Sequence, residues 1–412
     1  MKTMFVSYRL NICELYFVIL QQPTHKVKDR SPTIHPSRDI ACIVSQFILN
    51  SDKMTKGSFS GVPTVDISPY LADPKSDASR KVIEDVREAC ISTGFFQITG
   101  HGISKSLQQN IFDAAHSFFA LPLEEKKKLN AANFIGHRGY DVLASQSYEE
   151  GVLPDLKEGY YVGSNVLPSD PLYGRFFMGQ NVWPSTELLS TIRFQEPCER
   201  YHESVQHLAF KVLQLVGDTM IPHGHSTVGM TESMPTVLHN LIRLDKIPAC
   251  PLRLLHYPSA TRNGGSVTGK PQYGASAHTD FGVITLLLQD DNPGLEVLVE
   301  KDGKQVWWPI DPNPSAYVVN IGDMISMVTN GIYKSSMHRV VCKRPERERY
   351  SIVFFLDGCL NANLEPVEGF GHPEEGVGFS HKTVEQHMTE RLSMSYAKEG
   401  KDPRHNEDTF SA

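Results

Sequence analysis

Short apolar segments separated by turn residues dominate the second half of the chain. Valine, isoleucine, leucine and aromatic residues concentrate there in residues 252–258, 283–288, 295–299, 305–310, 316–321, 324–328 and 352–356. Glycine, proline and polar residues stand between these stretches, such as the Asp302-Gly303 pair that joins the third to the fourth. This pattern predicts antiparallel strands in a closed or sandwiched architecture. We expect strands at both 316–321 and 324–328, joined by a glycine turn.

Helical periodicity is strongest in the first half. Residues 79–93 place Val82, Val86, Ala89 and Cys90 on one side, as in an amphipathic helix. We expect further helices at residues 104–120, 123–129, 383–399 and within 187–216. Short strands are expected at 62–67 and 94–99, and long loops at 164–185 and 361–381. The prediction is an α+β protein with a mainly β core flanked by helices.

Composition narrows the class of protein. The 412 residues are 40% hydrophobic and 21% charged, which is typical of a soluble globular protein. A formal net charge of −7 gives no reason to expect nucleic acid or an anionic membrane as a partner. The apolar run at residues 10–20 is too short to span a bilayer and lacks a following cleavage site. We expect a cytoplasmic protein in which residues 1–56 are a poorly ordered extension.

The cysteines point to the same compartment. Seven cysteines are scattered singly along the chain, without any C-x-x-C pair. This argues against a disulfide framework and a structural zinc site, and it fits a reducing environment. Cys90 and Cys342 stand in apolar settings, so we expect both to be small core residues.

The candidate chemistry begins with His278 and Asp280, which precede the apolar run at 283–288. Residues two apart in an extended chain point to one face, so this imidazole and this carboxylate can reach one ion together. His338 stands before another strand-like segment and supplies a third ligand. Two imidazoles and one carboxylate are the ligand set of non-haem Fe(II) oxygenases. With 17 histidines in the chain, an H-x-D triplet alone also arises by chance.

A second pair of residues strengthens the metal hypothesis. Arg349 and Ser351 open the apolar stretch at 352–356 and share a face of the expected strand. Together they form a fork suited to a carboxylate. A structural arginine at a strand end is the alternative interpretation.

The order H-x-D, H, R-x-S resembles the 2-oxoglutarate/Fe(II)-dependent dioxygenases of the isopenicillin N synthase-like family. The N-terminal stretches at 94–102 and 136–161 are similar to that family as well. Residues 252–258 resemble its L-R-x-N-Y-Y-P segment, with Tyr257 on the second tyrosine and departures at Leu255 and His256. The resemblance implies a double-stranded β-helix jelly roll. It also implies four parts: an extension (1–56), an N-terminal helical and mixed domain (57–235), a jelly-roll catalytic domain (236–370), and a C-terminal loop, helix and tail (371–412).

The resemblance also implies the site and the reaction. Fe(II) would be held by His278, Asp280 and His338, and the far carboxylate of 2-oxoglutarate by Arg349, Ser351 and Tyr257. With O₂, such enzymes decarboxylate 2-oxoglutarate to succinate and oxidise a C–H bond of a small molecule, by hydroxylation, desaturation or ring formation. Relatives of this type point to a tailoring step in secondary-metabolite biosynthesis.

The substrate pocket would be lined by residues 136–164, the loop at 164–185, Phe281, and Phe354 or Phe355. Most of these residues are aromatic or apolar, which suits a small, partly hydrophobic metabolite. Arg138 and Arg175 are candidates for meeting a substrate carboxylate.

Three alternatives stay open at this point. Isopenicillin N synthase shares the R-x-S pair but uses no 2-oxoglutarate; its penultimate glutamine ligand has no counterpart in the ending Thr409-Phe-Ser-Ala412. In an inactive jelly-roll binding protein, substitutions would be expected in the metal triad or in the Arg349 and Ser351 pair, and all five residues are present. A zinc hydrolase uses a similar ligand set but has no need of the arginine fork.

Overall fold

The computed structural model describes residues 59–146, 151–221, 235–243, 246–259, 271–367, 370 and 382–397. Residues Ser58–Ala412 belong to one compact unit. The expected extension at residues 1–56 lies outside the described residues. So do most of the expected loop at 361–381 and the tail after residue 397.

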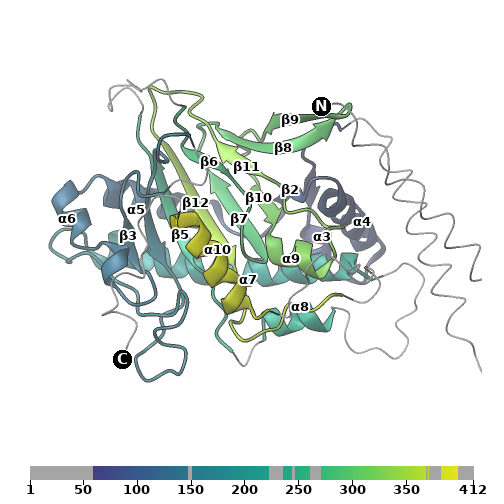
Figure 1. Cartoon of the computed structure of the whole chain (residues 1–412), viewed down its shortest axis with the longest axis horizontal. Coiled ribbons are helices and arrows are strands. Elements are labelled where there is room, and N and C mark those ends of the chain that lie inside the picture. The colour runs from purple at the N-terminus through teal and green to yellow at the C-terminus, as the bar shows by residue number, and fades with distance from the viewer. Residues whose placement is uncertain are drawn as a thin grey trace, which may run out of the picture. The chain divides into compact units, whose positions relative to one another are not determined.

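A mixed sheet of eight strands forms the centre of the unit (Figure 1). In spatial order its strands are β1 (Thr64–Asp66), β2 (Phe95–Thr99), β10 (Tyr317–Ile321), β7 (Ile284–Gln289), β12 (Arg349–Leu356), β5 (Leu252–Tyr257), β4 (Glu158–Val162) and β3 (Gly139–Asp141). All neighbours are antiparallel except β1 and β2. Strands from the first half of the chain therefore extend both edges of a sheet whose middle comes from the second half.

The smaller sheet has four strands and carries part of the candidate site. Its order is β6 (Ala275–His278), β11 (His338–Val340), β8 (Leu295–Lys301) and β9 (Lys304–Pro309). The turn between β8 and β9 is the expected D-G turn, with positive φ angles of 52° at Asp302 and 73° at Gly303. Such a turn matches the twist of the flanking strands.

The two sheets face one another across an apolar cluster. Leu255 and Val353 belong to it from the larger sheet, and Ala275 and Val297 from the smaller one. Two antiparallel sheets with their apolar faces together are the expected jelly-roll arrangement. This interior is where the sequence places the candidate metal and carboxylate sites.

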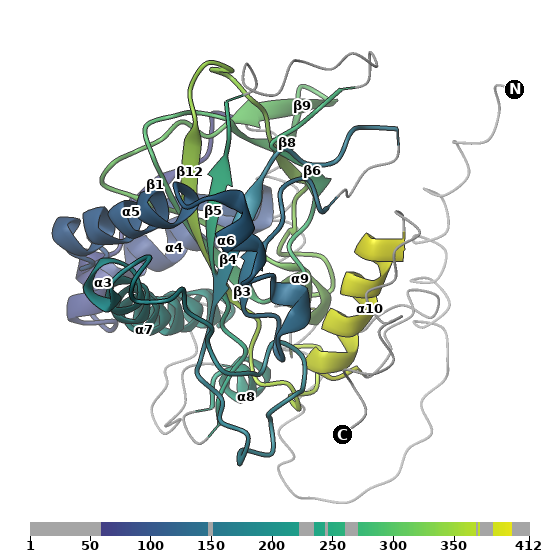
Figure 2. The ribbon, with the colours of Figure 1, turned by 90° about the vertical axis from the view of Figure 1, so that its left-hand side faces the viewer.

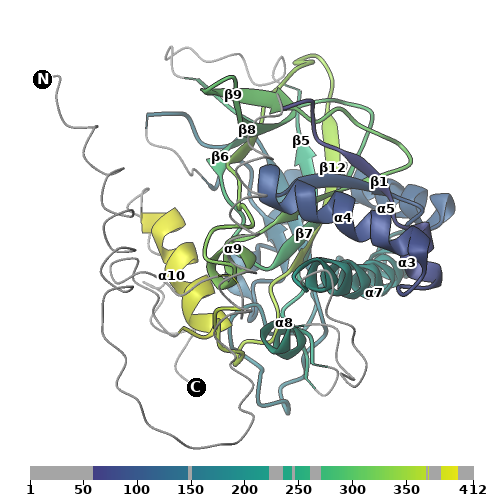
Figure 3. The ribbon, with the colours of Figure 1, turned by 90° about the vertical axis from the view of Figure 1, so that its right-hand side faces the viewer.

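Helices cover the other face of the larger sheet. Figures 2 and 3 show α3, α4, α5 and α7 on one side of its strands and α10 on the opposite side. The helices and 3-10 turns are α3 (Ser68–Ala72), α4 (Asp77–Ser92), α5 (Lys105–Phe119), α6 (Leu123–Lys127), η2 (Ala131–Asn133), η3 (Thr191–Arg193), α7 (Gln195–Thr219), α8 (Thr236–Leu241), α9 (Asp323–Val328) and α10 (Val384–Ala397). In α7 the buried residues recur every three or four positions, at Cys198, Tyr201, Val205, Leu208 and Val212. This spacing produces one apolar stripe toward the sheet.

Two expected elements differ in the structure. Residues 324–328 form helix α9 and not a strand, so that prediction is wrong. Gly322 stands in extended conformation before the helix, Asp323 places a carboxylate in its first turn, and Met324, Ile325 and Val328 share the buried side. The long helix expected within 187–216 begins only at Gln195, after the separate turn η3, and continues to Thr219.

Of the two cysteines expected in the core, one is buried and the other is exposed. Cys90 is fully buried on α4, as expected, whereas Cys342 is exposed just after β11 and is not a core residue. The short β11 ends at Val340, so the chain has already left the sheet at Cys342. Among the described helices, none combines the length and apolar character needed to cross a membrane.

Candidate active site

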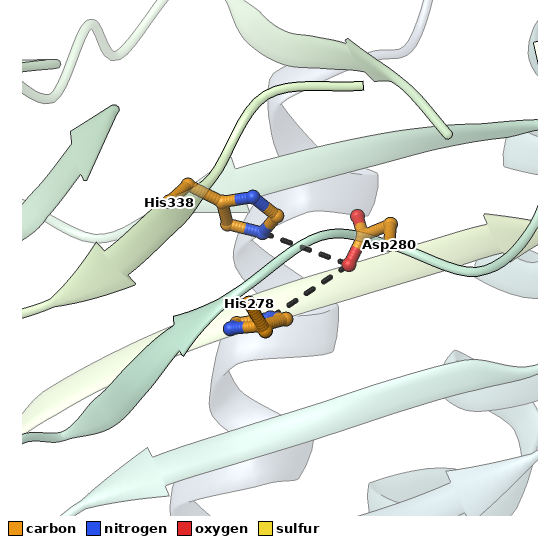
Figure 4. Close-up of side chains that lie close together, drawn as sticks. All are labelled: His278, Asp280 and His338. Carbon is orange, nitrogen blue, oxygen red and sulfur yellow. Dashed lines mark ion pairs between the residues drawn. The ribbon is translucent and has the colours of Figure 1, made fainter. Parts of the chain in front are cut away.

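The three predicted metal ligands lie together on the paired strands β6 and β11 and on the segment that follows β6. His278 ends β6, Asp280 follows two residues later, and His338 begins β11 directly opposite His278 in the antiparallel register. Side chains of directly opposed residues project to one face. The Oδ1 atom of Asp280 lies 3.7 Å from Nε2 of His278 and 3.6 Å from Nε2 of His338 (Figure 4). One ligand atom from each residue falls within 4.8 Å of the others, a spacing that one metal ion can bridge.

Backbone carbonyls orient both imidazoles. Nδ1 of His278 lies 2.8 Å from the carbonyl oxygen of Ser276, and Nδ1 of His338 lies 3.1 Å from that of Ser336. A carbonyl oxygen only accepts, so each Nδ1 carries the proton and each Nε2 presents its lone pair to the centre of the triad. This is the tautomer that binds a metal through Nε2.

The carboxylate of Asp280 is held by two residues that the sequence did not single out. Thr285 Oγ1 and Asn320 Nδ2 donate hydrogen bonds of 2.6 and 2.8 Å to its Oδ2 atom. Both donors use the same oxygen, so Oδ1 faces the histidines. Each donor is a polar residue inside an apolar strand, and this is the signal that would have found them.

Burial and the neighbouring side chains together set the protonation states of the triad. Burial, aided by the neighbouring His338 and Lys157, lowers the pKa of His278 to about 3. Burial opposes ionisation of Asp280, but the two imidazoles and the hydrogen bond from Thr285 hold its pKa well below the usual range. A neutral imidazole and an ionised carboxylate are the forms that bind metals.

The pKa of His338 shifts in the opposite direction from that of His278. Burial disfavours its charged form, but the adjacent Asp280 outweighs burial and raises the pKa of His338. The carboxylate therefore attracts a positive charge to this point. A divalent cation at the same place would compensate Asp280 and leave the imidazole neutral.

Arg349 and Ser351 share one face of β12, as predicted, and Tyr257 is the cross-strand neighbour of Arg349 on β5. The guanidinium carbon of Arg349 lies 4.9 Å from the centre of the Tyr257 ring. Nε and Nη2 of Arg349 donate to the Asn292 carbonyl at 3.1 Å and to Gln289 Oε1 at 2.9 Å. The remaining Nη1 atom and the Ser351 hydroxyl are buried without a hydrogen-bond partner.

Such a pair of unsatisfied groups is costly. Each buried polar group without a partner costs about 1–3 kcal/mol. Arg349 and Ser351 line the same pocket as the metal triad, so a carboxylate bound there would satisfy both groups at once. The fork therefore fits the far carboxylate of 2-oxoglutarate.

The remaining pocket wall is largely apolar, and part of it is an aromatic wall. Its lining includes Tyr161, Phe176, Phe177, Phe281 and Phe355. Of the two phenylalanines predicted from β12, Phe355 lines the pocket, whereas Phe354 belongs to the core on the helix side of the sheet.

Two buried ion pairs brace this wall. Lys157 lies 2.6 Å from Asp155, whose other oxygen accepts a 2.8 Å hydrogen bond from the Ser276 amide, two residues before His278. Arg253 pairs with Asp141 on the neighbouring side. Both cations line the pocket, but each already has a carboxylate partner.

The other basic candidates have structural roles. Arg138 is buried and donates to the carbonyls of Gly136 and Phe177, both at 2.7 Å. Arg175 pairs with Glu385 and does not line the pocket. The prediction that these arginines meet a substrate carboxylate is therefore wrong.

His256 is likewise no ligand. Its Nδ1 atom lies 2.7 Å from Oε1 of Glu158, and its ring stacks on Tyr350 at a centroid distance of 4.6 Å. Glu158 also accepts hydrogen bonds from Lys126 and Tyr140, so this is a buried structural network beside β5.

Replacing Thr285 with valine is expected to weaken Fe(II) binding roughly 10–100-fold, the range typical for an outer-shell partner of a metal ligand. Valine keeps the branched shape in β7 but cannot donate to Asp280. Anaerobic Fe(II) titration measures the change, and Thr285→Ser, which keeps the hydroxyl, is the matched control. Equal affinity in the valine and serine variants would contradict this role.

Comparison with known proteins agrees with the site. Residues 62–186 match the model of the N-terminal region of the non-haem dioxygenases in morphine synthesis, and residues 248–358 match that of the 2OG-Fe(II) oxygenase superfamily. The 2-oxoglutarate-dependent dioxygenase citB of Monascus ruber is 51% identical over 346 residues, covering 83% of this chain and 97% of that protein. Clavatol oxidase claD of Penicillium crustosum is 42% identical, covering 82% and 97%.

Solved structures give the same fold. A full-length Neurospora crassa protein, crystallised in complex with 2-oxoglutarate (alpha-KG) and thymine, superposes with a TM-score of 0.65 at 22% identity, covering 81% of this chain and 97% of that one. A putative 2OG-Fe(II) oxygenase family protein from Caulobacter crescentus gives a TM-score of 0.64 at 27% identity, covering 81% and 99%. These likenesses confirm the jelly-roll core flanked by helices. The chain therefore belongs to the 2OG-Fe(II) oxygenase superfamily and is a dioxygenase that uses Fe(II) and 2-oxoglutarate.

Proposed function

We propose that Fe(II) is held by His278, Asp280 and His338, and that Arg349, Ser351 and Tyr257 bind the far carboxylate of 2-oxoglutarate. The observation that carries this proposal is the pair of unsatisfied groups, Arg349 Nη1 and Ser351 Oγ, in one pocket with the triad. Two buried polar groups without a hydrogen-bond partner are unfavourable, and a bound carboxylate would remove that cost.

When bound, Fe(II) together with 2-oxoglutarate and O₂ supplies the oxidant for a C–H bond. The residues of the chain contribute position and surroundings. Arg349 and Ser351 fix one end of the cosubstrate, and the ion pair of Lys157 with Asp155 braces the strand that ends at His278. The aromatic wall excludes water, so that the substrate is the oxidised group.

The substrate is proposed to be a small, partly hydrophobic metabolite that carries an aromatic or comparably flat apolar group. Tyr161, Phe176, Phe177, Phe281 and Phe355 line the pocket, and aromatic lining suits such a group. Lys157 and Arg253 on the wall are each paired with a carboxylate, and burial raises the pKa of Asp357, which also lines the pocket, to about 8, so the pocket shows no demand for a highly charged ligand.

We propose that the reaction is a tailoring step of secondary-metabolite biosynthesis. The support is the likeness to named oxidases such as clavatol oxidase, together with the apolar pocket. Hydroxylation, desaturation and ring formation share the C–H oxidation step and differ in how the substrate is held afterwards. A cytoplasmic location is proposed from cysteine usage, because the described cysteines Cys90, Cys198, Cys250, Cys342 and Cys359 are all free thiols.

A turnover assay tests the proposed substrate class. The protein with Fe(II), O₂ and 2-oxoglutarate is expected to form succinate slowly alone, and several-fold faster with members of a panel of small aromatic metabolites. Product and succinate should then form in a ratio near one to one. A panel of polar amino acids and nucleobases is the comparison set. Acceleration by that set alone would contradict the proposed substrate class.

A further inference from the structure

The C-terminal helix α10 lies at the pocket and away from the helices on the other face of the large sheet (Figures 2 and 3). Two of its side chains, Met388 and Leu392, line the pocket that also contains the metal triad. Val384 at its start and Met388 are buried in the main core. The helix is therefore a wall of the substrate pocket, joined to the rest of the molecule by a small set of polar contacts.

Two side chains of α10 make polar contacts with the segment that carries two of the proposed metal ligands: Nε2 of His387 lies 3.0 Å from the Phe281 carbonyl oxygen, and Arg391 makes the other contact. Nη2 of Arg391 donates to Thr279 Oγ1 at 2.9 Å and lies 3.1 Å from Asp323 Oδ2. The guanidinium carbon also lies 4.6 Å from the centre of the Phe281 ring. Thr279 and Phe281 are the residues on either side of Asp280 in the chain. Arg391 therefore contacts both sequence neighbours of this proposed ligand.

Asp323 extends this contact to the third ligand. Its backbone N–H donates to the Asp280 carbonyl at 2.8 Å. Its Oδ1 atom accepts a 2.7 Å hydrogen bond from Ser335, three residues before His338, and its Oδ2 atom faces Arg391. Asp323 therefore joins the chain segments on both sides of the metal triad, and Arg391 clamps that junction from α10.

The other end of α10 is joined to the aromatic wall. Glu385 lies 2.5 Å from Nη2 of Arg175 and accepts the Phe176 amide at 3.3 Å. Phe176 and Phe177 line the pocket. One helix thus connects the substrate-facing loop to the metal-binding segment.

We propose that Arg391 is a positioning residue that couples closure of the substrate pocket by α10 to the geometry of the metal ligands, and that Met388 and Leu392 help to determine which substrates are accepted. This inference rests on the proposed ligand roles of His278, Asp280 and His338. Arg391 acts through Thr279 and Asp323 and touches none of the reacting groups.

The first test is the Fe(II) affinity of Arg391→Met, measured anaerobically in the presence of 2-oxoglutarate. The expected result is a fall of about tenfold, the low end for a residue that supports a metal ligand. The direction is diagnostic. Removing a nearby positive charge would by itself strengthen the binding of a cation, so a weaker affinity reports lost ligand geometry.

Two variants provide the controls. Glu385→Ala releases α10 from the aromatic wall and is expected to speed amide hydrogen exchange at the start of the helix and, through the proposed coupling, to weaken Fe(II) binding by less than Arg391→Met does. Arg80→Met removes an exposed arginine that pairs with Asp77 on the distant helix α4, and it should change neither property. If Arg391 merely helped the helix to fold, thermal stability would fall and Fe(II) affinity would stay at the wild-type value, which would overturn the proposal.

A double-mutant cycle with Thr279→Val identifies the route of the effect. If Arg391 acts through the Thr279 hydroxyl, the double variant should bind Fe(II) about as weakly as the weaker single variant, whereas independent effects would multiply. Arg391→Lys, which keeps the charge but cannot span Asp323, Thr279 and Phe281 together, should lie between wild type and Arg391→Met.

Failure of this inference is distinct from failure of the proposed function. Wild-type protein that does not bind Fe(II) would remove the proposed ligand roles themselves. Wild-type protein that binds Fe(II), with Arg391→Met binding it equally well and Arg391 and Thr279 showing no coupling, would overturn only the role of Arg391.

Discussion

Replacing Arg349 with alanine is expected to raise the Kd for 2-oxoglutarate by about 100-fold or more. Truncating one partner of a buried, hydrogen-bonded charge pair costs about 2–5 kcal/mol. Arg349 is 4% exposed, lines the pocket, and has an Nη1 atom without a hydrogen-bond partner. Without the guanidinium, the bound carboxylate would be buried beside Ser351 and Tyr257 with no compensating charge. Calorimetric titration of the Fe(II)-loaded protein under anaerobic conditions measures the change.

Arg347→Ala is the matched control for this experiment. Arg347 lies two residues earlier, is exposed, and pairs with Asp291 at the surface, where such pairs contribute about 0–1 kcal/mol. Its removal should leave the 2-oxoglutarate affinity within a factor of about two. Equal affinities in the two alanine variants would exclude Arg349 as the carboxylate partner.

The second large effect is expected from Asp280→Ala, which should abolish Fe(II) binding in the micromolar range. The substitution removes the only anionic member of the triad and leaves two buried imidazoles without a carboxylate to balance the charge of the ion. The loss should exceed the roughly 10–100-fold loss typical for an outer-shell residue such as Thr285. Anaerobic equilibrium dialysis with Fe(II) measures it directly.

His207→Ala is the control, because it removes a histidine that lies outside the triad. His207 is exposed on α7, and its Nδ1 atom contacts the Glu203 carbonyl, one helical turn earlier. Its removal should leave one bound Fe(II) per chain. Tight Fe(II) binding by Asp280→Ala would show that the metal lies elsewhere.

The proposed ligands are predictable from the sequence because each pair lies close together along the chain. Arg349 and Ser351 lie two residues apart within β12 and share a face for that reason, whereas Asp280 lies two residues beyond the end of β6 and its carboxylate is held by Thr285 and Asn320. Tyr257 can be named from its motif, and the structure places it directly across from Arg349.

The support of the metal site depends on register between distant strands, which the sequence does not specify. Thr285 and Asn320 face one another across β7 and β10, and this pairing brings both donors to Asp280. The contact of Arg391 with Thr279 joins residues 112 positions apart. The sequence shows that polar residues such as Thr285 and Asn320 stand within apolar segments, but it does not show which side chain each one contacts.

The wrong predictions have a related cause. The strand expected at residues 324–328 rests on apolar content alone, although a five-residue apolar run fits a buried helix equally well. Arg138 and Arg175 are predicted to contact a substrate carboxylate only because they are close in sequence to the expected pocket lining. Their guanidinium groups are used by backbone carbonyls and by Glu385, contacts that form only once the loop has folded.

The most direct test of the central claim is visible absorption of the anaerobic protein with Fe(II) and 2-oxoglutarate. A 2-oxoglutarate molecule that chelates the iron produces a metal-to-ligand charge-transfer band. We predict that this band appears in the wild-type protein and saturates at far higher 2-oxoglutarate concentration in Arg349→Ala. Fe(II) binding without any such band in the wild-type protein would contradict the account.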